Sequence, residues 1–209
     1  LFGVVLFAAL VPIALQDFLQ AETVLSLVLF SSMLLLTKRD GSRLVLLLVT
    51  ILCCTARTDH ALFGALIYGL MHGIESLRRR QWFGALFSAL LLIIPVAATA
   101  LISVFLFPEA EYYVDLIQLE FNITHIWSWI FPSILLLLPI VFFSQIKHVE
   151  FYRKTWPWIP FFVAANFIVG KTAEVRLFLP LVIYSIPLVI GGMNRSLEGE
   201  EALTDSGEV

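Results

Sequence analysis

Long apolar runs alternate with short polar connectors along most of this chain. The runs cover residues 1–16, 22–37, 44–56, 61–77, 82–107, 126–146, 156–170 and 177–193. A helix needs about 20 residues to cross the roughly 30 Å apolar core of a bilayer, and several runs approach that length. Lipid offers no partner to backbone N–H and C=O groups, so a crossing segment must be helical. The pattern predicts an all-α fold, a polytopic transmembrane helical bundle of about eight spans, over residues 1–193.

Two of these runs fit a full span less well than the others. The run 44–56 is short for the apolar core of a bilayer. The run 61–77 contains His72 and three glycines, so we expect it to be tilted or packed inside the bundle.

Composition supports a membrane protein. The chain is 60% hydrophobic and 14% charged, with a mean hydropathy of +0.94, far from the usual balance of a soluble protein. Eighteen Phe and five Trp suit a lipid-facing surface with aromatic residues at its boundaries. We therefore expect membrane lipid as a partner and no nucleic acid.

The basic residues predict an orientation. Connectors 38–43, 78–80 and 147–154, together with Arg195, hold ten of the thirteen Lys and Arg. Eight alternating spans would place all of them on one side, which the positive-inside rule makes cytoplasmic. The C-terminal segment 194–209 would lie on the same side. It is acidic and lacks aromatic residues, so we expect a disordered tail.

The remaining three cations, Arg57, Lys171 and Arg176, fall on the opposite, outer side, each within a few residues of Asp59 or Glu174. Guanidinium groups bind phosphate in a bidentate manner, and carboxylates can hold an arginine, accept a proton or bind a metal. The sequence predicts an anion-binding site here. The simpler interpretation is that these charges pair locally and anchor helix ends at the lipid headgroups.

Two smaller features lie in or near the predicted spans. Cys53 and Cys54 are adjacent inside a span, where we expect buried packing residues, and no Cys/His spacing indicates a metal site. Asn122-Ile123-Thr124 matches the glycosylation sequon on the outer side, a pattern that is common by chance.

The order of several short motifs is similar to that in a known enzyme family. They are Glu22-Thr23-Val24-Leu25 opening a span, the basic turn 38–43, the segment Thr55–Phe63, the triplet Arg78-Arg79-Arg80 and the late segment Glu174–Pro180. This order resembles the GT-C superfamily of polytopic glycosyltransferases, over about residues 15–107 and 170–192. Thr58 and His60 replace the proline and glycine of the family's Thr-Arg-Pro-Asp/Glu-Gly type motif.

The resemblance implies an enzyme of the bacterial inner membrane that takes a sugar from a polyprenyl-phosphate donor on the periplasmic or lumenal face. The implied phosphate-binding cations are Arg57, Arg176 and Lys171, and the candidate catalytic groups are Asp59, Glu174 and His60. A divalent metal cofactor is compatible with these carboxylates but is not specified.

The family's usual catalytic acid lies in the first outer loop, where this chain has only Asp17 as a remnant. Because Leu1 lies inside an apolar run, we interpret the sequence as a fragment or as a chain beginning after a cleaved signal peptide. In a fragment, that acid could lie outside the sequence.

Two other function classes remain open. A non-catalytic membrane subunit would use its helices to scaffold a larger complex and would bury the Arg57 and Arg176 pairs in protein contacts. A transporter would place charged residues near the bilayer midplane, whereas most charges here lie near the ends of spans.

Overall fold

The computed structural model describes residues 21–106, 117–141, 149–170 and 174–191. Within these ranges the chain forms helices joined by turns and bends, without a strand, which confirms the all-α class. In chain order they are α2 (Ala21–Lys38), α3 (Arg43–Ala56), α4 (Thr58–Tyr68), η1 (Gly69–Gly73), α5 (Ile74–Arg78), α6 (Trp82–Leu101), η2 (Ile102–Leu106), α7 (Leu119–Thr124), η3 (Ile126–Trp129), α8 (Ile130–Val141), α10 (Glu150–Thr155), α11 (Trp158–Val169), η4 (Val175–Phe178) and the helix Leu179–Gly191. The predicted span 1–16 and the tail 194–209 lie outside the described residues.

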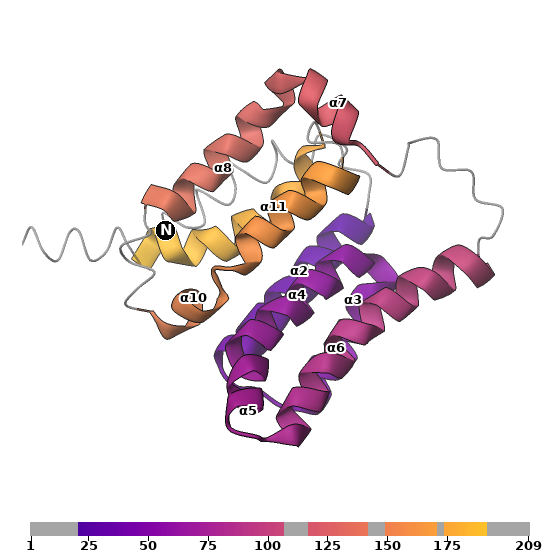
Figure 1. Ribbon diagram of the computed structural model, residues 1–209, viewed down its shortest axis with the longest axis vertical. Helices are drawn as coiled ribbons and strands as arrows, with labels where there is room; N and C mark the ends of the chain where they lie inside the picture. Colours follow the sequence, from indigo (N-terminus) through magenta and orange to yellow (C-terminus); the bar gives the residue numbers. More distant parts are fainter. Residues whose placement is uncertain (1–20, 107–116, 142–148, 171–173, 192–209) are drawn as a thin grey trace, which may run out of the picture.

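The helices form two groups that meet along α2 and α4 (Figure 1). One group contains α2 to α6, and the other contains α8, α10, α11 and the helix Leu179–Gly191. Phe30 on α2 and Phe63 on α4 pack into an aromatic core with Trp158 of α11. Met33 of α2 instead packs into a second core with α3, α4 and α6. The two central helices are therefore apolar on both faces.

The turns after α2 and α5 are built alike. Asp40 (φ 49°) and Arg80 (φ 56°) adopt the left-handed conformation just beyond each helix. The next residues, Gly41 and Gln81, each donate a 2.8 Å hydrogen bond to the carbonyl five residues earlier. This arrangement satisfies carbonyls at a helix C-terminus and reverses the chain within a few residues. Both turns belong to the basic connectors, so the turn geometry keeps those connectors short.

Small residues bring η1 and α5 close to α6. A Cβ atom added to Gly73 would lie 2.8 Å from the Oγ of Ser88, and one added to Gly84 would overlap the Oγ of Ser76. Gly and Ser at facing positions let helix backbones approach closely, a common packing mode within membranes. The contact depends on glycine at both places.

Helix length corrects the prediction of about eight spans. Each predicted span after the first overlaps a described helix, but within the described residues only Trp82–Leu106, of 25 residues, is long and apolar enough to cross a membrane. Helix α3 has 14 residues, or about 21 Å. It ends because Arg57 is extended (φ −153°, ψ 113°). Breaks like this one leave the other apolar helices shorter than a full span.

Candidate functional site at the ends of α3 and α4

Arg57 occupies the break between α3 and α4, and its backbone N–H donates a 2.7 Å hydrogen bond to the carbonyl of Cys53. Its guanidinium binds Asp59 in a bidentate manner, with Nε 3.0 Å from Oδ1 and Nη2 2.6 Å from Oδ2. The Arg57 side chain is 17% exposed and that of Asp59 is 41% exposed. The structure thus joins two of the predicted site residues in one ion pair that still reaches solvent.

Asp59 lies in the first turn of α4, where the helix dipole favours a negative charge. Burial raises the pKa of its carboxyl, but the hydrogen bond from Arg57 and the nearby positive charge outweigh that effect, and the pKa falls below its ordinary value. Asp59 is therefore ionised at neutral pH. A carboxylate held this way orients the guanidinium and is a weak proton acceptor.

His60 points into the bundle. The residue is fully buried, and its ring lies 6.1 Å from that of Phe30. Burial lowers the pKa of His60 to about 4, so the imidazole is neutral at pH 7. As an acid/base candidate, His60 has the right chemistry but no solvent-exposed surface.

The second predicted cluster is only partly described. Lys171 lies outside the described residues, and of Arg176 the structure describes the backbone, in η4, but not the side chain. Glu174 is half-buried just before η4, and its carbonyl accepts a 3.0 Å hydrogen bond from Leu177. Whether the two arginine side chains converge therefore stays a prediction.

Packing links η4 to the start of α4. Phe178 at the end of η4 stacks edge-on against Phe162 of α11, and Phe162 packs against Phe63 of α4 at 4.8 Å between ring centroids. Figure 1 shows that α2 and α4 begin at the end of the molecule at which α11 terminates. The Arg57–Asp59 pair and Glu174 therefore lie toward one end of the bundle, although far apart in sequence.

Asn122 has a role that the sequence did not indicate. It is fully buried, and its amide donates 2.7 Å hydrogen bonds to the carbonyls of Phe167 and Gly170 at the C-terminus of α11. The indole of Trp129 donates in turn to the carbonyl of Asn122. A buried amide engaged in this way cannot carry a glycan in the folded protein, so the sequon interpretation is wrong here.

The basic connectors meet at the other end of the bundle. Glu75 of α5 binds Lys154 of α10 at 2.6 Å and Arg79 at 2.5 Å, and Lys154 also binds Glu150 at 2.8 Å. These contacts join two of the three basic connectors directly. A polar cavity of about 250 Å³ at this end is lined by Asp40, Arg43, Tyr68, His72, Glu75, Ser76, Arg79 and Gln81. Asp40 and Arg43 bring in the remaining connector.

Metal binding finds no support in the described part of the chain, which contains no group of three or more His, Cys, Asp or Glu side chains placed to hold an ion. Comparison of the whole chain with protein-family models, curated proteins and solved structures finds no match.

Proposed function

We propose that this chain is an integral membrane protein whose helical bundle lies in a bilayer. The observation that carries the proposal is the apolar outer surface. On α6 and η2 the side chains of Trp82, Phe83 and Phe105 are 67%, 73% and 74% exposed. Further large exposed hydrophobic residues occur along the other helices: Val24, Leu25 and Val28 on α2; Leu44, Leu48 and Leu52 on α3; Ile134, Leu137 and Ile140 on α8; and Phe161 and Val169 on α11. Soluble monomers rarely expose such extensive apolar surface.

The interior supports the same conclusion. Many fully buried polar residues are small hydroxyl residues that bond to their own helix: Ser26 to Thr23, Thr50 to Leu46 and Thr155 to Phe151. A protein surrounded by lipid gains little by burying its apolar side chains, and it uses small and polar residues where its helices meet. Helices shorter than a full span remain compatible with a bilayer that thins locally around them.

The orientation follows from the charges. The structure brings the three basic connectors to one end, and the positive-inside rule makes this end cytoplasmic. The Arg57–Asp59 pair then faces the periplasm or lumen. The expected location is the bacterial inner membrane.

For activity, we propose sugar transfer from a polyprenyl-phosphate donor at this outer face. The bidentate pair supports the proposal, because Asp59 uses two of the five guanidinium N–H donors of Arg57 and leaves three for a phosphate.

In the reaction a carboxylate would remove a proton from the acceptor hydroxyl while cations stabilise the departing lipid phosphate. Arg57 takes the phosphate role, and Arg176 and Lys171 are the further candidates. Asp59 positions Arg57, and Glu174 remains the candidate acid/base group, because His60 is fully buried and cannot reach an acceptor hydroxyl.

A non-catalytic membrane subunit is the second candidate. Two observations favour it. Arg57 already forms an ion pair with Asp59 of the same chain, and α3 and α6 have long exposed apolar faces that could pack against helices of other membrane subunits.

The membrane proposal is tested by alkaline carbonate extraction of the expressed protein and by labelling with a membrane-impermeant maleimide. On a background without Cys53 and Cys54, Thr124→Cys should react from outside, and Ser42→Cys only after permeabilisation. Both residues are exposed, and α7, which contains Thr124, lies at the opposite end of the bundle from the turn between α2 and α3, which contains Ser42 (Figure 1). Release by carbonate would refute the membrane location, and the reverse labelling would refute the orientation.

The activity is tested with a panel of polyprenyl-phosphate sugars and the purified protein. Transfer should be lost in Arg57→Gln and weakened in Arg57→Lys, which keeps the charge but loses the bidentate fork. Arg39→Gln, an exposed cation at the basic end, is the matched control. No transfer by the wild type, with the membrane location intact, would overturn the enzyme proposal. Co-purification of other membrane proteins would then favour the subunit.

A further inference from the structure

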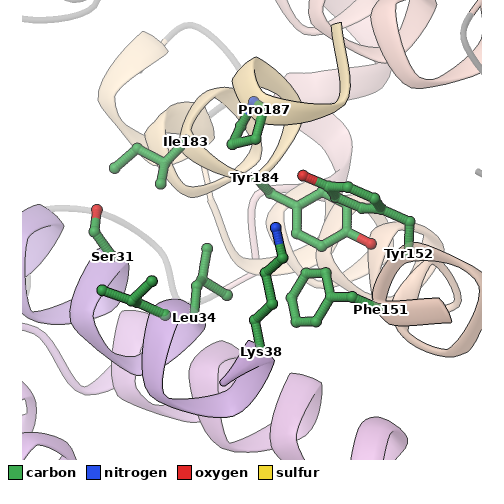
Figure 2. Close-up of a pocket in the computed structure, with 9 residues that line it drawn as sticks. Ser31, Leu34, Lys38, Phe151, Tyr152, Ile183, Tyr184 and Pro187 are labelled. Atoms are coloured by element: carbon green, nitrogen blue, oxygen red, sulfur yellow. The ribbon is translucent and has the colours of Figure 1, made fainter. Parts of the chain in front are cut away.

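A separate cavity lies at the basic end of the bundle, away from the Arg57–Asp59 pair. It has a volume of about 210 Å³ and lies between α2, α10 and the helix Leu179–Gly191 (Figure 2). It is lined by Ser31, Leu34, Leu35, Lys38, Phe151, Tyr152, Ile183, Tyr184 and Pro187. Neither the predicted anion site nor the polar cavity beside His72 includes these residues.

The lining contains one cation and no carboxylate. Figure 2 shows the Lys38 side chain extending from α2 past the ring of Phe151 toward Tyr184, with its amino group over the cavity. Among the described residues Lys38 has no carboxylate within 4.0 Å, whereas Lys154 on α10 is bound to both Glu75 and Glu150. The cavity is therefore apolar with a positive charge at its edge.

Two tyrosines form the wall opposite Lys38. Tyr184 is held in place because its hydroxyl lies 2.8 Å from the Oγ1 of Thr155, and its ring packs edge-on against that of Tyr152 at 5.2 Å. The Tyr152 hydroxyl has no hydrogen-bond partner in the described part of the chain, and in Figure 2 it points toward Pro187 across the cavity. It is a second polar group available to a ligand.

We propose that this cavity binds one anionic phospholipid, with its phosphate at Lys38 and Tyr152 and part of an acyl chain against Leu34 and Ile183. This inference depends on the proposed membrane location. The volume equals about seven water molecules, enough for a segment of one lipid but not for a whole one. A free phosphate would gain nothing from the apolar lining, whereas a lipid satisfies both the apolar wall and the cation.

The position of the cavity agrees with such a ligand. It lies at the end that carries the basic connectors, at the level where the headgroups of the cytoplasmic leaflet would lie. That leaflet carries a negative surface potential, and basic pockets between helices on this side bind anionic headgroups. The cavity and the basic connectors would then both contact anionic headgroups of the cytoplasmic leaflet.

The test uses the full chain purified in detergent, stripped of lipid and mixed with phosphatidylglycerol or phosphatidylcholine of identical acyl chains. Native mass spectrometry then counts retained lipids. The wild type should retain one phosphatidylglycerol in preference to phosphatidylcholine. Lys38→Met keeps an apolar side chain of similar length but removes the charge. It should lower the preference for phosphatidylglycerol over phosphatidylcholine about tenfold, because a charge-assisted hydrogen bond to the phosphate is lost. Lys38→Arg should restore it, and Ile183→Trp should fill the cavity and reduce retention of both lipids.

Arg39→Gln is the matched control, because it removes the adjacent exposed cation without altering the lining. Equal losses in Lys38→Met and Arg39→Gln would show general surface attraction and overturn the site. Equal retention of both lipids by the wild type, or no retention, would also overturn it. Carbonate extraction of the same variants separates this failure from failure of the membrane proposal, because Lys38→Met should stay in the membrane fraction.

Discussion

Replacing Asn122 should loosen the link between α7 and α11. The amide of Asn122 is fully buried and supplies two 2.7 Å hydrogen bonds to the carbonyls of Phe167 and Gly170. Asn122→Ala removes both donors and leaves two carbonyls at a helix end without these partners. At about 1 kcal/mol net for each bond, the free energy of unfolding should fall by about 2 kcal/mol.

Asn122→Asp tests the hydrogen bonds more directly, because aspartate has the same shape as asparagine but no N–H donor. An ionised carboxylate would face two carbonyl oxygens in a buried site, so we expect a loss larger than that of Asn122→Ala. The assay is unfolding of the detergent-solubilised protein by titration with SDS, followed by far-UV circular dichroism.

Thr124→Ala is the control, since this exposed hydroxyl bonds to carbonyls of its own helix and to the adjacent His125. Its effect should stay within about 0.5 kcal/mol. The reasoning is refuted if Asn122→Asp unfolds like the wild type, or if Asn122→Ala and Thr124→Ala behave alike.

Three further predictions concern the packing and the site. Gly84→Leu should lower the unfolding free energy by about 1–3 kcal/mol in the same titration, because a side chain there overlaps Ser76. The free energy of unfolding of the wild type should fall by up to about 3 kcal/mol as the pH falls from 6.5 to 4. The reason is that His60 takes up a proton near pH 6.5 in the unfolded protein but only near pH 4 in the folded protein. His60→Phe should flatten this pH dependence. Alanine variants of Arg57 and Asp59, alone and together, should give a coupling energy of about 1 kcal/mol in a double-mutant cycle, since the pair is partly exposed.

Each of these has a clear opposite outcome. Tolerance of Gly84→Leu without loss of stability would contradict the close approach of α5 and α6. An unchanged pH profile in His60→Phe would assign the acid sensitivity to another group. Zero coupling would show that the ion pair does not persist in solution.

Local patterns in the sequence predicted much of the fold. Apolar runs placed helices close to where the structure has them, since hydrophobic runs and polar turns act over a few residues. The proximity of Arg57 to Asp59 was also visible, because two residues of separation suffice for an ion pair. Helix lengths were predicted less well: the extended backbone at Arg57 and the π-helical segments η1 and η2 have no comparable hydrophobic signal.

Contacts between distant parts of the chain decided the rest. Asn122 reaches residues 45 and 48 positions away, and Lys154 reaches Glu75 across 79 positions. The burial of His60 against Phe30 and the cavity beside Lys38 likewise depend on helices far apart in sequence. The sequence by itself determined the helical, apolar character of this protein and the clustering of its positive charge in a few connectors, because both follow from composition and short-range order. Only the tertiary structure decided which polar groups are buried, which are paired and where the cavities lie, because these depend on which helix faces meet.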